Sequence, residues 1–186
     1  MRVVSGNCKG LSLKAVPGMS TRPTTDKVKE AMFNIIGPYF EGGLVLDLFG
    51  GSGGLGIEAL SRGIDRAIFV DREAKAIKTI KENLVTCKLA DHAEVYRNDA
   101  ERAIKAIVKR ELQFDLILLD PPYKDQKIIS LLRIIDEHNL LHKNGTILIE
   151  HATDVELPAE IGNFTRRKAE TYGICAVTVY RFNEEV

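Results

Sequence analysis

The sequence has few cysteines, no apolar segment of membrane-spanning length and no net charge. The three cysteines are an odd number, are widely separated and form no CxxC pair, and the four histidines show no metal-ligand spacing. This pattern indicates neither a disulfide framework nor a metal site. No apolar run has the length of a bilayer span or of a signal-peptide core. The sequence therefore predicts a soluble, cytoplasmic protein without a structural metal.

The length and composition indicate one globular domain with a small appendage. The chain has 186 residues, of which 45% are apolar and 28% charged, and it contains no repeat or low-complexity segment. The glycine-bearing stretch at 37–43 is the candidate boundary. We predict an N-terminal appendage at residues 1–40, a main domain at residues 41–186, and a monomer.

The zero net charge conceals an uneven distribution. From Met1 to Lys29 the chain carries six basic residues and one acid, which gives this segment a net charge of +5. A basic arm on a neutral body suits contact with phosphates, although a solvated terminal segment has the same composition. The candidate phosphate contacts are Arg2, Lys9, Lys14 and Arg22.

The N-terminal segment predicts a small β-hairpin followed by a helix. The β-prone stretches at 2–4 and 11–16 flank a glycine-bearing turn. Capping residues at 24–26 then precede apolar residues at helical spacing from Val28 to Ile36, and Gly37-Pro38 ends the helix.

The rest of the chain alternates between short apolar runs and helix-length segments. The five runs are 44–46 before Asp47, 67–70 before Asp71, 95–96 before Asp99, 114–119 before Asp120, and 146–149 before Glu150. The helical segments are 55–62, 73–85, 100–111 and 126–138. This alternation predicts an α/β fold with a Rossmann-like, mostly parallel sheet covered by helices on both faces. The alternating stretch 174–182 is typical of a last, antiparallel hairpin strand.

In such a sheet the ligand crevice lies outside the carboxyl ends of the strands, so the five acids gather at one edge. A crevice rich in carboxylates favours a ligand with positive charge and hydroxyls and disfavours a polyanion.

The first crevice loop carries a GxGxxG pattern at Gly51, Gly53 and Gly56, with Asp71 20 residues after Gly51. Alone, the pattern fits a nicotinamide dinucleotide as well as another nucleoside cofactor. Asp47 is unfavourable beside a pyrophosphate but suits an ammonium group. S-adenosylmethionine satisfies the whole set because it has sulfonium and ammonium charges, a ribose diol, an adenine and no phosphate.

The tetrad Asp120-Pro121-Pro122-Tyr123 ends the apolar run from Phe114. Two prolines after a carboxylate stop both helix and strand, which predicts a stiff, exposed elbow. A flat ring with an amino group could stack on Tyr123 while Asp120 and the Pro121 carbonyl accept its N–H bonds. An ordinary surface turn is the alternative interpretation.

Several motifs together resemble the bacterial RsmD family of 16S ribosomal RNA guanine-N2 methyltransferases. The most specific is the block Arg22-Pro23-Thr24-Thr25-Asp26, joined here to the glycine loop and to the Asp-Pro-Pro-Tyr tetrad. The resemblance runs from Arg2 to that tetrad and weakens beyond Pro158. It implies S-adenosylmethionine-dependent methylation of the exocyclic N2 of a guanine, at position 966 of 16S ribosomal RNA, during small-subunit assembly.

The resemblance also implies roles for individual residues. Asp47, Phe49, Gly51, Ser52 and Gly53 would form the methionine and ribose side of the cofactor pocket. The ribose diol would contact Asp71, and the adenine would contact Arg72, Asp99 and Ala100. Thr24 and Thr25 would close the pocket, and the RNA would be bound by Arg2, Lys9, Lys14 and Arg22. The target guanine would be held by Asp120, Pro121, Pro122 and Tyr123.

Other functions stay open at this point. A DNA adenine-N6 methyltransferase shares the tetrad, although the chain has little room for a target-recognition domain. An NAD-dependent oxidoreductase uses only the glycine loop and Asp71, and a non-catalytic RNA-binding module does not need the acids. The cluster Arg166-Arg167-Lys168 is either a second phosphate contact or a charged hairpin loop.

Overall fold

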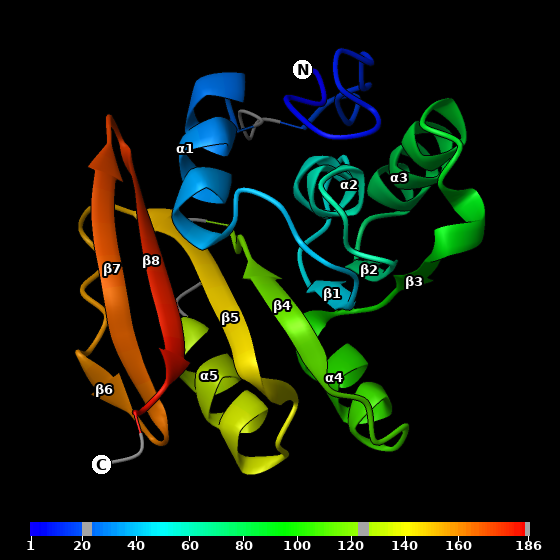
Figure 1. Ribbon diagram of the computed structural model, residues 1–186. Coiled ribbons are helices and arrows are strands. Elements are labelled where there is room, and N and C mark those ends of the chain that lie inside the picture. The colour runs from blue at the N-terminus through cyan, green and yellow to red at the C-terminus, as the bar shows by residue number, and fades with distance from the viewer. Residues whose placement is uncertain (20–23, 123–126, 185–186) are drawn as a thin grey trace.

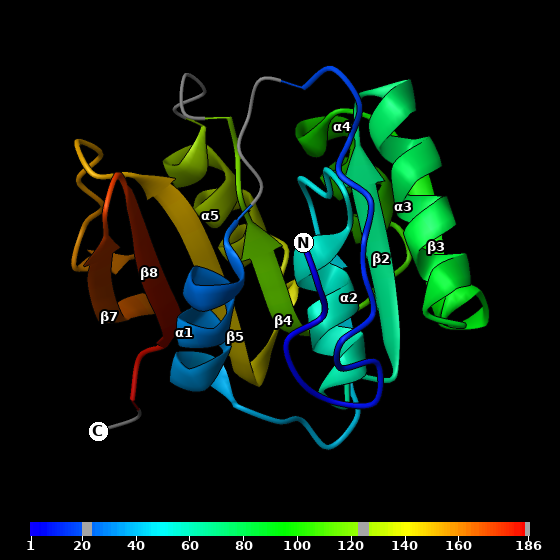
Figure 2. The ribbon, with the colours of Figure 1, turned by 90° about the horizontal axis from the view of Figure 1, so that it is seen from above.

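The computed structural model describes residues 1–19, 24–122 and 127–184. An eight-stranded sheet with the order β3-β2-β1-β4-β5-β8-β7-β6 forms its centre, and helices cover both faces of this sheet (Figures 1 and 2). The predicted fold class, a mostly parallel Rossmann-like sheet that ends in antiparallel strands, is confirmed.

Five parallel strands follow the predicted apolar runs. Their bounds are β1 Leu44–Asp47, β2 Arg66–Asp71, β3 Ala93–Arg97, β4 Phe114–Leu119 and β5 Leu141–Ala152. In β1, β2 and β4 the apolar runs are buried, because helices cover both sides of the sheet at this point. The strand β5 begins five residues before the predicted Thr146, with an irregular register opposite the start of β4.

The three antiparallel strands are β6 Glu160–Ile161, β7 Phe164–Tyr172 and β8 Cys175–Phe182. The sequence predicted only the last of them. Most side chains of β7 between its ends are exposed and polar or small, so this strand lacks a continuous apolar signal. Arg166, Arg167 and Lys168 lie within β7, and the interpretation of this cluster as a hairpin loop is therefore wrong.

The sheet separates two hydrophobic cores. The helices α1 Asp26–Ile36, α2 Gly54–Ser61 and α3 Ala74–Thr86 pack on one face together with the N-terminal segment. On the other face lie α4 Ala100–Val108 and α5 Ile128–Glu137. A short 3₁₀ helix, Ala90–His92, precedes β3.

The N-terminal segment packs on α2 and α3, and its two β-prone stretches pair as a short, irregular antiparallel hairpin. They share one bridge, between Arg2 and Ser12, and the N–H groups of Val3 and Leu13 donate to the carbonyls of Leu11 and Met1 at 3.0 and 2.9 Å. Other backbone N–H groups of this segment bond to other elements. Val4 and Ser5 donate to the Glu58 carboxylate at 2.8 and 3.0 Å, and Lys14 donates to the Asn83 side chain at 2.8 Å.

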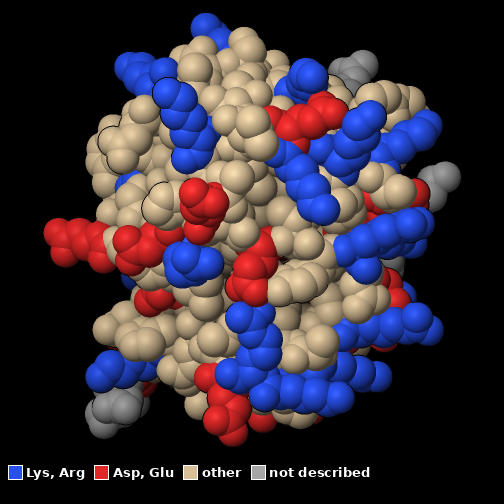
Figure 3. All heavy atoms as spheres, turned by 90° about the vertical axis from the view of Figure 1, so that its right-hand side faces the viewer, with Lys and Arg blue, Asp and Glu red and all other residues tan. Residues whose placement is uncertain are grey.

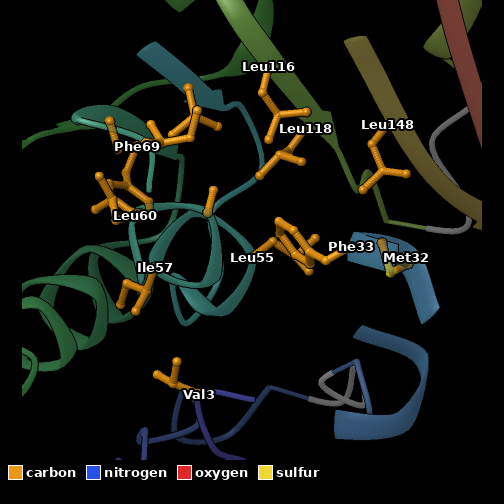
Figure 4. Close-up of a cluster of buried hydrophobic side chains, with 14 of the residues drawn as sticks. Val3, Met32, Phe33, Leu55, Ile57, Leu60, Phe69, Leu116, Leu118 and Leu148 are labelled. Carbon is orange, nitrogen blue, oxygen red and sulfur yellow. The ribbon is translucent and has the colours of Figure 1, made fainter. Parts of the chain in front are cut away.

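Residues from both predicted domains contribute to the core on the α1 side. Figure 4 shows Phe33 of α1 near Leu55 of α2, and Val3 belongs to the same buried cluster. A buried ion cluster lies between α1 and α2, where Glu58 faces Lys29 at 3.5 Å and Arg62 at 2.7 Å. The division at residue 40 stays a prediction, but these two segments are packed as one body.

Candidate active site

The parallel strands bring four acids to one edge of the sheet. Asp47 ends β1 and Asp71 ends β2. Asp120 follows β4 directly, and the pairing of Leu119 with Ile149 places Asp120 beside Glu150 of β5. The sequence pattern predicted this gathering of acids, because carboxyl ends of parallel strands share an edge.

The loop between β1 and α2 is held by backbone N–H bonds to these acids. Gly56 donates to the Asp47 carboxylate at 3.1 Å, and Gly51 donates to the Asp71 carboxylate at 2.9 Å. Gly51 has a φ of 56° with open space where a side chain would project, whereas a Cβ on Gly56 would lie 2.3 Å from the Phe69 ring. The first glycine of the pattern, Gly51, therefore faces open space, and the third, Gly56, permits close packing.

The predicted adenine contacts lie at the outer part of the edge. Asp99 is exposed and caps α4, where it accepts from the Arg102 N–H at 2.9 Å. Arg72 is exposed beside Glu73, at 3.5 Å. Asp71 also accepts from the Glu73 N–H at 2.9 Å, so both of its oxygens have a backbone donor. Contact of these residues with an adenine or a ribose stays a prediction.

The acids at the centre of the edge bind protons more tightly than ordinary carboxyls. Burial raises the pKa of Asp47 to about 7, and the negative charge of Asp71 adds to this shift. Burial also raises the pKa of Asp120 well above its usual range, with additions from the charges of Glu150 and Asp47. The pKa of Glu150 is raised mainly by burial, against hydrogen bonds from Thr24 and Cys175. Like charges crowded in a low-dielectric crevice favour a bound cation.

The predicted elbow begins at this centre. Asp120 is half-buried, Pro121 is buried and Pro122 is exposed. The Asp120 carboxylate and the backbone of Pro121 therefore lie together at the crevice. Tyr123, the fourth residue of the tetrad, lies outside the described residues.

The N-terminal segment reaches the same edge through Thr24. The Thr24 hydroxyl donates to the Glu150 carboxylate at 2.7 Å, while the Thr25 hydroxyl accepts from the Val28 N–H at 3.3 Å and caps α1. The sequence identified Glu150 as a strand-end acid but did not assign it to the site. The signal available was its position after the fifth apolar run, equivalent to that of Asp120.

The three predicted phosphate contacts that the structure describes lie on the surface, and two of them form ion pairs. Arg2 pairs with Asp26 at 3.4 Å and Lys14 with Glu82 at 3.3 Å, both on the surface, and Lys9 is exposed. Arg22 lies outside the described residues. Figure 3 shows the face at the right of Figure 1, where Lys and Arg side chains gather with acids among them.

Residues 1–19, 24–122 and 127–184 contain neither a candidate metal site nor a candidate membrane-spanning helix. In these ranges no group of three or more His, Cys, Asp or Glu side chains is arranged to hold a metal ion. None of the helices there is both long and apolar enough to cross a membrane.

The fold and the site together define a Rossmann-like methyltransferase. The features that do so are the sheet order, the glycine loop after β1 and the acid–proline elbow after β4. The chain matches the family model described as "Conserved hypothetical protein 95" over residues 1–181. It belongs to this family, the RsmD family.

Similar proteins cover almost the whole chain. A Bacillus subtilis protein named "Putative rRNA methyltransferase YlbH" is 61% identical over 181 residues, which are 97% of this chain and 98% of the relative. The "Ribosomal RNA small subunit methyltransferase D" of Haemophilus influenzae is 32% identical over 182 residues, 97% of this chain and 93% of the relative. The solved structure of "Putative methyltransferase yhhF" from Escherichia coli gives a TM-score of 0.82 at 28% identity and covers 100% of this chain and 99% of that one.

Proposed function

We propose that the protein transfers a methyl group from S-adenosylmethionine to the exocyclic N2 of a guanine in 16S ribosomal RNA during small-subunit assembly. Guanine 966 is the proposed target. The observation that carries the proposal is the position of Asp120, beside a proline elbow and among crowded carboxylates. The names of the two relatives above support ribosomal RNA as the substrate class.

The residues at the edge fit S-adenosylmethionine better than a dinucleotide. A pyrophosphate would add negative charge to a crevice in which the pKa values of Asp47, Asp120 and Glu150 are already raised. A ligand with a sulfonium and an ammonium group would relieve this repulsion. Asp47, Phe49, Gly51, Ser52 and Gly53 would hold its methionine and ribose side. The outer part would contact Asp71, Arg72, Asp99 and Ala100, with Thr24 and Thr25 closing the pocket.

The cofactor supplies an electrophilic methyl group, and the chain supplies the acceptors that orient the amine. An aryl amine is a poor nucleophile because its lone pair is delocalised into the ring. Hydrogen bonds from N2 to the Asp120 carboxylate and the Pro121 carbonyl would favour a pyramidal nitrogen. As the N–C bond forms and the methyl–sulfur bond breaks, positive charge develops on N2, and Asp120 would stabilise it there until one N2 proton leaves to solvent. Pro122 and Tyr123 would complete the platform for the guanine ring.

The RNA would be bound through phosphates outside the crevice. Arg2, Lys9, Lys14 and Arg22 are the proposed contacts, and the +5 charge of the segment from Met1 to Lys29 favours them. With so short a basic arm on a monomeric chain, the shape of the target in the assembling particle would contribute to specificity.

The test is methyl transfer from labelled S-adenosylmethionine to small-subunit particles that lack the modification, followed by nucleoside analysis. We expect the label in N2-methylguanosine, in an RNA fragment that contains guanine 966. Duplex DNA in the same assay tests the DNA adenine alternative, and a binding comparison with NAD tests the oxidoreductase. Label in a methyladenosine, or no transfer despite cofactor binding, would overturn the substrate assignment.

A further inference from the structure

The turn between β7 and β8 lies at the same edge of the sheet as Asp120. Cys175 pairs with Ala152, which is two residues beyond Glu150 on β5, and β5 is the strand next to β4. With strands about 4.8 Å apart and residues about 3.4 Å apart along a strand, the Cα of Ile174 lies roughly 14 Å from that of Asp120. Figure 2 shows this turn and the end of β4 on the same side of the sheet.

Ile174 is held out toward solvent by a tight turn. Its exposed fraction is 74%, the highest of any large hydrophobic residue in the part of the chain that the structure describes. Tyr172 pairs with Cys175, which leaves Gly173 and Ile174 as a two-residue turn. Gly173 has a φ of 63° whereas Ile174 has no positive φ, a combination typical of a type II′ turn.

Both ends of this turn are anchored next to the crevice. Tyr172 packs against the core on the α1 side. Cys175 is buried, and the pairing of β5 with β8 places it diagonally across from Glu150. The exposed isoleucine therefore projects from a rigid turn, with its Cα roughly 14 Å from that of Asp120, beyond the base that Asp120 would hold.

We propose that Ile174 is a positioning residue that packs against the base next to the target guanine and fills stacking surface as that guanine leaves the stack. This inference rests on the proposed function. A base that undergoes chemistry on its amino group must be extruded from a helix or a stacked loop, at a cost of a few kcal/mol. Proteins that deform nucleic acids insert apolar side chains, including isoleucine, between neighbouring bases. A rigid turn makes the wedge effective because little side-chain or loop ordering is needed on binding.

The experiment compares Ile174→Ala with Val85→Ala in methyl transfer to the small-subunit particle. Val85 is a matched control because it is also an exposed aliphatic residue, 67% exposed, but lies on α3, which packs against β2 and β3 at the opposite end of the strand order from β7 and β8. We expect Ile174→Ala to lower kcat/KM for the particle about tenfold, the loss given by removing most of an apolar contact. Its affinity for S-adenosylmethionine and its unfolding midpoint should equal those of the parent protein, and Val85→Ala should change none of these quantities.

A second measurement follows the base directly. A target-site RNA with 2-aminopurine in place of the target guanine brightens when the base leaves the stack. We expect saturating parent protein and the Val85→Ala variant to raise the fluorescence equally, and Ile174→Ala to raise it less. Equal brightening or equal kcat/KM for Ile174→Ala and the parent would overturn the inference. If the parent protein methylates no guanine, the proposed function fails instead, and the two failures are distinguishable.

Discussion

The molecule buries charge in two places, and the two clusters are built in opposite ways. Between α1 and α2, Glu58 lies between Lys29 and Arg62, and all three side chains are at most 3% exposed. At the carboxyl edge of the sheet, carboxylates lie next to carboxylates. Within residues 1–19, 24–122 and 127–184, no Lys or Arg forms an ion pair with Asp47, Asp71, Asp120 or Glu150.

The difference separates a cluster that serves folding from one that serves binding. In the first, opposite charges and the N–H groups of Val4 and Ser5 satisfy Glu58, so the N-terminal segment is fixed to α2. In the second, hydrogen bonds reach the carboxylates of Asp47, Asp71 and Glu150 but leave the repulsion among the acids. A folded protein tolerates such repulsion where a ligand later supplies the opposite charge. Variants of the two clusters should therefore fail in different assays.

The largest effect is expected for Asp120→Asn. The amide keeps the size of the side chain but removes the charge that would stabilise the developing cation on N2. We expect a loss of about a thousandfold in kcat, with S-adenosylmethionine affinity within a few fold of the parent protein. Isothermal titration with the cofactor and single-turnover methyl transfer separate the two quantities. The exposed acid Asp154, which follows β5, gives the control Asp154→Asn with unchanged turnover; parent-like rates for Asp120→Asn would rule out the mechanism.

The next effect belongs to the paired cluster. Glu58→Gln leaves Lys29 and Arg62 buried without a countercharge, and we expect a loss of about 3–5 kcal/mol in the free energy of unfolding. Denaturant titration measures it. The control is Glu170→Gln, which breaks an exposed pair with Lys168 at 3.7 Å and should cost less than about 1 kcal/mol. A loss for Glu58→Gln as small as that of the control would show that the buried cluster does not hold the segment.

The unpaired cluster predicts an unusual dependence of stability on pH. The pKa of Asp47 is about 7 in the folded protein and 3.8 in a model peptide, so the folded state retains a proton that the unfolded state loses. Its contribution to stability is complete below about pH 4 and is lost as the pH rises through 7. The pKa values of Asp120 and Glu150 are shifted in the same direction. We therefore expect the ligand-free protein to lose the contribution of Asp47 to stability between about pH 4 and pH 7, with Asp120 and Glu150 adding in the same direction.

Thermal unfolding across this range, with and without ligand, tests the prediction. A cationic ligand binds best to ionised carboxylates, so stabilisation by S-adenosylmethionine should grow as the pH rises. S-adenosylhomocysteine lacks the sulfonium charge and should show a smaller increase. Asp47→Asn should flatten the curve of the ligand-free protein. An unchanged slope in that variant would show that Asp47 is already ionised.

Much of the fold could be predicted from local signals. The five parallel strands end within two residues of the acid that follows each apolar run, and α1 ends before Gly37 as the Gly37-Pro38 pair predicted. The strand β7 could not be predicted from the sequence, because its residues 166–171 are exposed and mostly charged or small. They lack the alternation of apolar and polar residues that is typical of a half-buried strand. The predicted N-terminal hairpin is short and irregular, because several of its N–H groups bond to α2 and α3, far along the chain.

The sequence predicted the site residues that lie at the end of a strand. It could not predict side-chain contacts between residues that are far apart in the sequence. Asp47 and Asp120 were identified from position alone. In the sequence, Glu58 and Arg62 look like an ordinary surface pair four residues apart on a helix, and only the structure shows that Lys29 completes a buried cluster. Likewise, the hydrogen bond that Glu150 accepts comes from Thr24, 126 residues earlier in the chain.

The smallest expected effect concerns that last contact. Thr24→Val removes the hydroxyl that donates to Glu150 at 2.7 Å, and a lost hydrogen bond to a charged acceptor raises the pKa of Glu150 further. Because the N-terminal segment then binds the edge less firmly, we expect S-adenosylmethionine affinity to fall about tenfold. Thr79→Val, which removes a hydroxyl bonded only within α3 at 2.9 Å, is the matched control and should leave that affinity unchanged. In a Glu150→Ala background, Thr24→Val should add nothing; a full tenfold loss there would place the role of Thr24 elsewhere, in direct contact with the cofactor.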